Sequence, residues 1–233
     1  MRSFFNNFSI KICPLSQLCY NILHQLEEIM FYHFIRPVAR FIVWLLNGHL
    51  HVNHKERIPE GNYILAAPHR TWWEPILFAL AASPKEFMFM AKIELFKNPI
   101  LRFILKHAHA FPVDRKHPGP SALKTPINGL RKGNYSLIIF PSGTRHSSEM
   151  KGGTIAIAKL ANKPIVPVVY QGPLTFTGLL KRQPLEVCFG EPFMVDRKIK
   201  LTHENETMLD NKLKKAWDKV DYEQNPNFHY QPK

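Results

Sequence analysis

The sequence is poor in cysteine and in acidic residues, and it has no long uninterrupted apolar segment. Its three cysteines among 233 residues are an odd number without the spacing of metal ligands, so we expect neither a disulfide framework nor a zinc site, and a reducing compartment is favoured. A membrane-spanning helix needs about 20 mostly apolar residues. The best candidate, 41–50, follows Arg36 and Arg40 and is interrupted by Asn47 and His49, so we expect no spanning helix. The N-terminal stretch also lacks the cleavage site of a signal peptide.

The scarcity of acidic residues leaves the chain strongly basic. It has 31 Lys and Arg against 18 Asp and Glu, a formal net charge of +13. Such a charge favours anionic partners, but it does not choose among nucleic acid, anionic lipid headgroups, acidic carrier proteins and phosphorylated metabolites. The apolar content of 45% excludes a disordered chain, and the length suits one domain.

The N-terminal part has a helical pattern of apolar residues. Between 17 and 47 they recur every three or four positions, at Leu18, Ile22, Leu26, Met30, Phe34, Val38, Ile42 and Leu45. This spacing predicts one helix, or a pair of helices broken near Pro37. The helix either packs on the core of the domain or lies among lipid headgroups, and the pattern leaves both open. We expect residues 1–47 to form an amphipathic helical segment that anchors the protein to a membrane surface.

Beyond residue 48, short apolar runs alternate with helical patterns, which predicts an α/β fold. We expect a single domain with a mixed, largely parallel sheet flanked by helices at 48–222, and a flexible tail at 223–233. Strands are expected at 49–54, 62–67, 87–91, 110–114, 135–140, 165–169 and 185–189. Helices are expected at 75–82, 98–107, 120–132, 151–161 and 205–220.

A group of chemically active residues follows the expected strand at 62–67. It reads Pro68-His69-Arg70-Thr71-Trp72-Trp73-Glu74-Pro75, and strand ends are where sites collect in α/β folds. Pro75 suits the first turn of a helix, which places Glu74 near the N-cap and lets its carboxylate fold back onto His69. The carboxylate would fix one ring nitrogen and leave the other as a base for a hydroxyl. The alternative is a surface histidine beside a capping glutamate.

Further polar residues follow the next strands. Lys92 precedes Ile93-Glu94-Leu95, Val113-Asp114-Arg115 ends another strand, and Phe140-Pro141-Ser142-Gly143-Thr144-Arg145 follows a third. A proline-rich strand, 164–169, comes last. We expect the side chains of Lys92, Arg115 and Arg145 to surround the face that holds His69, as phosphate binding requires.

These four ordered blocks resemble the motifs of the 1-acylglycerol-3-phosphate acyltransferase family of glycerolipid synthesis. The family pattern is His-x-x-x-x-Asp, then Lys-x-x-Leu with Val-Asp-Arg, then Phe-Pro-Glu-Gly-Thr-Arg, then a proline-rich strand; it covers about residues 60–170. Two positions depart from it. Glu74 stands where the family usually has Asp, which keeps the charge, and Ser142 stands where it usually has Glu, which removes one.

The resemblance implies an enzyme that transfers an acyl group from an acyl thioester or acyl phosphate to the free sn-2 hydroxyl of 1-acylglycerol 3-phosphate, giving phosphatidic acid. His69 would be the general base and Glu74 its carboxylate partner. Lys92, Arg115 and Arg145 would bind the acceptor phosphate. Ser142, Gly143 and Thr144 would form the motif turn at the acceptor site.

The expected partners are lysophosphatidic acid, a donor carried by acyl-carrier protein or coenzyme A, and an anionic membrane surface on the cytoplasmic face of the cell membrane, reached as a peripheral or monotopic protein. No nucleic acid, cofactor or metal is expected. Two alternatives stay open. One is an acyltransferase acting on glycerol 3-phosphate or another lysophospholipid, and the other is a non-enzymatic basic module that binds membranes or nucleic acid.

Overall fold

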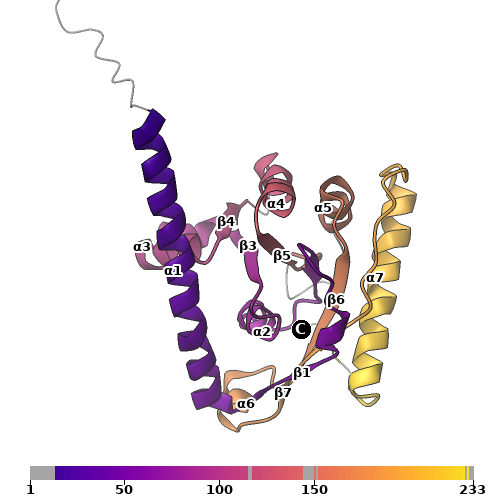
Figure 1. The fold of residues 1–233 in the computed structure, drawn as a ribbon. Helices are drawn as coiled ribbons and strands as arrows, with labels where there is room; N and C mark the ends of the chain where they lie inside the picture. Colours follow the sequence, from indigo (N-terminus) through magenta and orange to yellow (C-terminus); the bar gives the residue numbers. More distant parts are fainter. Residues whose placement is uncertain (1–13, 115–116, 144–149, 151, 229, 231–233) are drawn as a thin grey trace, which may run out of the picture.

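A seven-stranded sheet forms the centre of the protein, in the order β1-β7-β6-β2-β5-β3-β4 (Figure 1). The computed structural model describes residues 14–114, 117–143, 150, 152–228 and 230, with side chains from residue 30 onward. The strands are β1 (Leu50–Asn53), β2 (Ile64–Ala66), β3 (Glu86–Lys92), β4 (Ala110–Val113), β5 (Tyr135–Ile139), β6 (Ile165–Gln171) and β7 (Leu185–Phe189). Neighbouring strands pair in parallel, except that β6 and β7 are antiparallel. The expected mixed, largely parallel sheet is confirmed.

Helices cover both faces of this sheet. They are α1 (Pro14–Asn47), α2 (Glu74–Ala81), α3 (Pro99–His107), α4 (Ser121–Lys132), α5 (Gly153–Ala161), α6 (Phe176–Leu180) and α7 (His203–Gln224), with 3-10 turns η1 (Lys55–Arg57) and η2 (Ile93–Lys97). Successive strand residues face opposite sides: Leu65 packs in the core beside α2, whereas Ile64 and Ala66 pack in the core beside α5 and α7. Figure 1 shows α1 and α2 on one side of the sheet and α4, α5 and α7 on the other.

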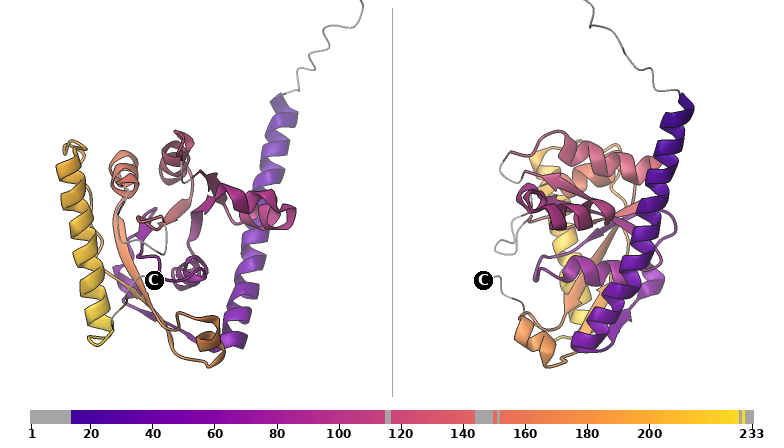
Figure 2. Two further views of the ribbon diagram at one scale, coloured as in Figure 1. Left: turned by 180° about the vertical axis from the view of Figure 1, so that it is seen from behind. Right: turned by 90° about the vertical axis from the view of Figure 1, so that its left-hand side faces the viewer.

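The α1 helix is continuous through Pro37, so the alternative of two broken helices is not what the structure shows. Contacts hold it on both sides of the proline. Before it, the Arg36 guanidinium donates to the carbonyls of Pro84 and Lys85 at 2.8 and 3.2 Å. After it, the Asn47 amide donates to the Gln183 carbonyl at 2.6 Å. Figure 2 shows α1 lying along one side of the domain. None of the helices in the described part of the chain combines the length and the apolar character needed to cross a membrane.

The order of connections places a topological switch point between β2 and β5. β2 and β5 are neighbours in the sheet. From β2 the chain passes through α2 to β3, which lies beyond β5. From β5 it passes through α5 in the opposite direction to β6, which lies beyond β2. Connections that depart in opposite directions from adjacent parallel strands leave a crevice at their carboxyl ends, where α/β proteins bind ligands. The segments 67–73 and 140–143 therefore meet there.

Most element boundaries lie within a few residues of those expected from the sequence. The α7 helix is longer than expected: the Thr202 side chain caps its start by accepting from the Asn205 amide at 3.4 Å, and it ends at Gln224, so the first residues of the expected tail are helical. The short α6 helix was not expected. It is nucleated by Thr175, whose hydroxyl accepts from the Gly178 amide.

Candidate active site

His69 and Glu74 contact each other at the carboxyl end of β2. The Nδ1 atom of His69 lies 3.1 Å from Oε2 of Glu74. The Glu74 side chain is fully buried, and the imidazole is 13% exposed. With Nδ1–H donating to the carboxylate, Nε2 is the basic atom of the ring. The contact expected between these two residues is therefore present.

The local sequence explains why the carboxylate faces the imidazole. Glu74 is the first residue of α2 and Pro75 follows it in the first turn, where a proline costs no hydrogen bond. The backbone N–H of Arg70 donates to Oε2 of Glu74 at 2.8 Å, so the loop closes onto the helix start. A carboxylate is also favourable at the positive end of the helix dipole.

Glu74 is held in an environment that resists its charge. Burial raises the pKa of its carboxyl group, and the hydrogen bond from His69 and the backbone amides of Thr71 and Arg70 oppose this rise. Its second oxygen, Oε1, is buried and has no hydrogen-bond partner among the described residues. Buried carboxylates of this kind are typical of functional sites, because they are costly to keep for stability alone.

The turn after β5 completes one wall of the site. The ring of Phe140 lies against the His69 imidazole, with centroids 4.1 Å apart and an angle of 30° between planes. The Gly143 amide donates to the Phe140 carbonyl at 2.8 Å, and Gly143 has a φ of 65°, a left-handed conformation that favours glycine. Ser142 is buried within this turn. The first and third sequence blocks therefore meet in space.

The expected phosphate-binding residues are described only in part. Lys92 stands at the end of β3 with a half-exposed side chain, and its Nζ lies 3.2 Å from Oε1 of Glu94. Arg115, Thr144 and Arg145 lie outside the described residues. Within the described ranges, no group of three or more His, Cys, Asp or Glu side chains could hold a metal ion.

A separate groove of about 610 Å³ lies between α1, β1 and the end of α2, and His69 does not line it. Its walls include Phe41, Trp44 and Leu80, with Arg40 and Lys55 as cationic members. Because α2 begins at Glu74 and Leu80 lies near its other end, this groove is remote from the dyad.

Two features of the site were not anticipated from the sequence. Phe140 belongs to the third sequence block, but no local pattern indicates that it lies against His69. Arg70 is the second such residue: its guanidinium is buried beside the site and paired with Asp221 of α7. The only sequence signal for Arg70 is its place next to His69, and Asp221 gives none.

The comparisons with known proteins agree on one family. A family model described as Acyltransferase matches residues 49–171. A 1-acyl-sn-glycerol-3-phosphate acyltransferase from Streptococcus pneumoniae is 43% identical over 196 residues, which is 83% of this chain and 74% of that protein. One from Bacillus subtilis is 40% identical over 154 residues, 65% of this chain and 77% of that protein.

A solved structure has the same fold. The crystal structure of the 1-acyl-sn-glycerophosphate (LPA) acyltransferase PlsC from Thermotoga maritima superposes with a TM-score of 0.63, covering 86% of this chain and 81% of that one, at 21% identity. The α7 helix lies beyond the end of the family-model match but within the described domain.

Proposed function

This chain belongs to the acyltransferase family, as its four sequence blocks predicted, and we propose that it transfers an acyl group to the free sn-2 hydroxyl of 1-acylglycerol 3-phosphate, giving phosphatidic acid. The names of the two bacterial relatives, each matched over about three quarters of its own length, support the acceptor. The observation that carries the chemistry is the contact between His69 Nδ1 and Glu74 Oε2 at the carboxyl end of β2.

The mechanism needs no covalent enzyme intermediate. Nε2 of His69 takes the proton from the acceptor hydroxyl as its oxygen attacks the acyl carbonyl, and the negative Glu74 stabilises the imidazolium that forms. The new C–O bond replaces the bond from the carbonyl carbon to the donor's sulfur or phosphate oxygen. The leaving group departs as a thiolate or a phosphate, and the imidazolium gives its proton to the thiolate or to solvent, which restores neutral His69. Phe140 holds the ring from the side and limits its rotation.

Positive side chains at neighbouring strand ends would bind the acceptor phosphate. Lys92 ends β3, Arg115 is two positions beyond β4, and Arg145 follows the turn after β5. Guanidinium groups bind phosphate through paired hydrogen bonds. Ser142, Gly143 and Thr144 would border the acceptor hydroxyl, with Ser142 as a neutral replacement for the carboxylate usual in the family.

The acyl donor is proposed by class. A thioester carried by acyl-carrier protein or coenzyme A, or an acyl phosphate, would suit a basic protein because all three carriers are anionic. Initial rates with each donor at a fixed acceptor concentration distinguish them.

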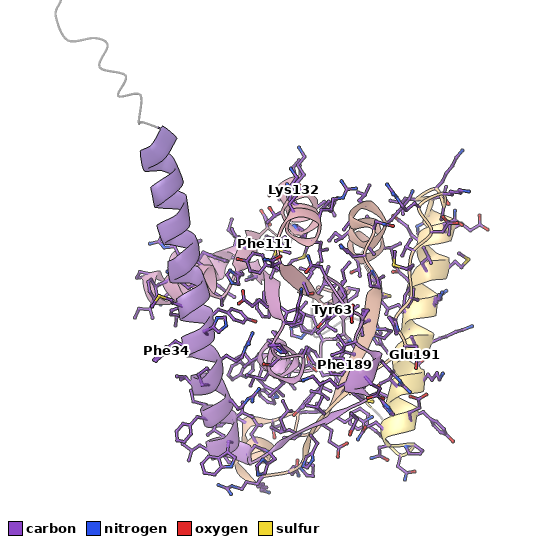
Figure 3. All side chains as sticks on the ribbon, in the orientation of Figure 1. Phe34, Tyr63, Phe111, Lys132, Phe189 and Glu191 are labelled. Carbon is purple, nitrogen blue, oxygen red and sulfur yellow. The ribbon has the colours of Figure 1, made fainter. Side chains whose placement is uncertain are left out.

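We also propose that the protein works at an anionic membrane surface on its cytoplasmic side. Exposed apolar side chains line the described part of α1, and Phe34, 67% exposed, points away from the domain (Figure 3). A second exposed apolar group lies on α3, including Ile100 and Phe103, and the rings of Phe31 and Phe103 join the two helices, with centroids 5.7 Å apart. Since α3 follows the carboxyl end of β3 through η2, contact of α3 with lipid would place the carboxyl ends of the strands near the bilayer.

Flotation with vesicles tests this surface. Wild-type protein should float with vesicles containing anionic lipid, less at high salt, and Phe103→Glu should weaken flotation. Met208→Glu on α7 is the matched control, because Met208 is about as exposed as Phe103 but lies on another helix. Equal flotation of both variants would show that α3 does not contact the membrane.

An acyl-transfer assay tests the function itself. Purified protein is incubated with a labelled acyl donor and a panel of 1-acylglycerol 3-phosphate, glycerol 3-phosphate and other lysophospholipids. We expect phosphatidic acid as the main product, and His69→Ala should lower turnover about 10² to 10⁴-fold. His203→Ala, at the exposed start of α7, is the control and should leave turnover unchanged. Transfer mainly to another acceptor would show that 1-acylglycerol 3-phosphate is not the preferred substrate. Full activity of His69→Ala would refute the mechanism.

A further inference from the structure

We infer that Arg70 is a positioning residue for the His69–Glu74 dyad and that the C-terminal helix α7 holds it in place through Asp221. This inference rests on the proposed function of the dyad. It assigns a role to a helix that lies beyond residues 49–171, where the family model matches.

The guanidinium of Arg70 is buried, and both of its terminal nitrogens have acceptors, whereas its Nε has no hydrogen-bond partner among the described residues. Its side chain is 4% exposed, and that of Asp221 is 16% exposed. Nη1 donates to the Tyr170 carbonyl at 2.6 Å and to Oδ1 of Asp221 at 3.0 Å, while Nη2 pairs with Oδ2 of the same carboxylate. The rings of Phe228 and Tyr230 face the guanidinium carbon at 5.0 and 5.3 Å. A two-point contact between planar groups sets orientation as well as distance.

The backbone of Arg70 carries this constraint to the dyad. Its N–H donates to Oε2 of Glu74 at 2.8 Å, and the same oxygen lies 3.1 Å from Nδ1 of His69. His69 is also the residue directly before Arg70 in the chain. A shift of residue 70 would therefore move both the carboxylate and the imidazole.

The α7 helix is itself fastened to the sheet at this point. The Trp217 indole donates to the Ala66 carbonyl at 2.8 Å, at the end of the strand that leads into the His69 loop. The Gln171 amide donates to the backbone carbonyl and to Oδ1 of Asp221, both at 2.9 Å. Figure 1 shows α7 beside β6, the strand that ends in Gln171. Asp221 is thus held from the sheet on one side and holds Arg70 on the other.

Stability alone is a poor explanation for this pair. A buried ion pair often contributes no more to folding than apolar residues of the same volume, because both charges lose their hydration. Its two-point geometry instead restricts where the His69 loop can lie. Catalytic groups lose rate quickly when their geometry shifts, so a device that fixes the loop is expected beside them.

Hydrogen exchange tests the mechanical part without any activity assay. In the full-length protein, Asp221→Asn should speed exchange of the amides in the peptide that spans 69–74, because the Arg70 N–H loses its fixed position. Glu223→Gln is the matched control. It breaks an ion pair of the same helix, between Glu223 and Arg57 at 2.9 Å, that does not touch the loop, so exchange at 69–74 should stay unchanged. Equal exchange in the two variants would overturn the inference.

Kinetics test the link to the dyad. Asp221→Asn should lower kcat about tenfold to a hundredfold and leave both KM values within about twofold, and Asp221→Glu should restore part of the rate. Combined with His69→Ala, it should add little further loss, because the position of the dyad no longer affects the rate once the base is removed. Independent, multiplying losses would mean that Asp221 supports only the fold.

Arg70→Lys covers the case in which Asp221→Asn does not fold. It keeps the charge but not the two-point contact, so the same faster exchange and lower kcat are expected. Unchanged exchange and rate in Arg70→Lys would overturn the inference. If the wild type transfers no acyl group to any acceptor, the proposed function fails, while the exchange result still decides whether α7 holds the loop.

Discussion

Replacing Glu74 with glutamine removes a charge from the dyad and preserves its shape. Oε2 of Glu74 lies 3.1 Å from His69 Nδ1 and accepts the Arg70 N–H at 2.8 Å. A glutamine must present its carbonyl oxygen at that position, because its NH₂ group would face the Arg70 N–H donor to donor. The tautomer of His69 is then unchanged, and Nε2 remains the base.

The expected loss of rate follows from the lost charge alone. A hydrogen bond to a charged group contributes about 1.5 to 3 kcal/mol and one between neutral groups about 0.5 to 1.5 kcal/mol. The difference of about 1 to 2 kcal/mol lowers kcat roughly 5- to 30-fold. Removal of the base in His69→Ala should cost far more, about 10² to 10⁴-fold.

The same substitution changes how stability depends on pH. Burial raises the pKa of the Glu74 carboxyl in the folded state above 4.5, the ordinary value that applies to the unfolded state. Between the unfolded-state pKa and the folded-state pKa, the folded state binds more protons than the unfolded state. The contribution of Glu74 to the free energy of unfolding therefore falls as pH rises through this range. Glutamine does not titrate, so Glu74→Gln should gain stability relative to wild type between pH 4.5 and pH 7.

Initial rates of acyl transfer and urea unfolding at the two pH values are the assays. Glu204→Gln, on the exposed first turn of α7, is the control for both. A folded Glu74→Gln protein that loses more than about 10³-fold in kcat would refute the orientation argument, because only a reversed tautomer explains such a loss. Unchanged kcat would show that the carboxylate does not assist His69.

Three further predictions concern residues around the site and in the core. His109 has a φ of 58°, and burial lowers its pKa to about 4, so its contribution to the free energy of unfolding should rise from pH 4 to pH 6.5. His109→Asn, which suits that backbone, should therefore change its urea midpoint less favourably than wild type over this range. Burial raises the pKa of the Cys188 thiol to about 11. In a protein with Cys13→Ser and Cys19→Ser, a thiol reagent at pH 7 should therefore react only after unfolding. Rapid reaction of the native protein would contradict this prediction. Ser142→Ala should lower kcat/KM by at most about tenfold, the value of one neutral hydrogen bond, and a loss as large as that of His69→Ala would give the hydroxyl a catalytic role.

The α/β class and the location of the strands were predictable because they depend on short-range patterns. Each expected strand from 49–54 to 185–189 corresponds to a strand of the sheet. For the central strands β2, β5 and β6, the reason is that a strand buried on both faces needs a short apolar run. Local signals were weaker elsewhere. A proline in a helical pattern normally indicates a break, but α1 continues through Pro37, with Arg36 before it and Asn47 after it bonded to the domain.

Within the site, the dyad was predictable because its two members lie five positions apart and the chemistry of a helix start brings them together. The resemblance to a known family supplied the acceptor, which no spacing rule could have supplied, whereas the positions of Lys92, Arg115 and Arg145 after predicted strands had already suggested phosphate binding. The neighbours of the dyad were not predictable in this way. Phe140 reaches His69 only because β5 pairs directly with β2, an order of strands that the chain does not follow in sequence.

The ion pair between Arg70 and Asp221 shows most clearly which features depend on the local sequence and which depend on the tertiary structure. By itself, the sequence indicated the strands and most of the helices, the contact between His69 and Glu74, and the family, because these depend on residues close together or on ordered motifs. Only the tertiary structure showed that Asp221 of the C-terminal helix α7, 151 residues further along the chain, pairs with Arg70 in the loop after β2. The physical reason is that a contact at such a separation depends on how α7 packs on the sheet, and the packing results from the whole core rather than from any local pattern.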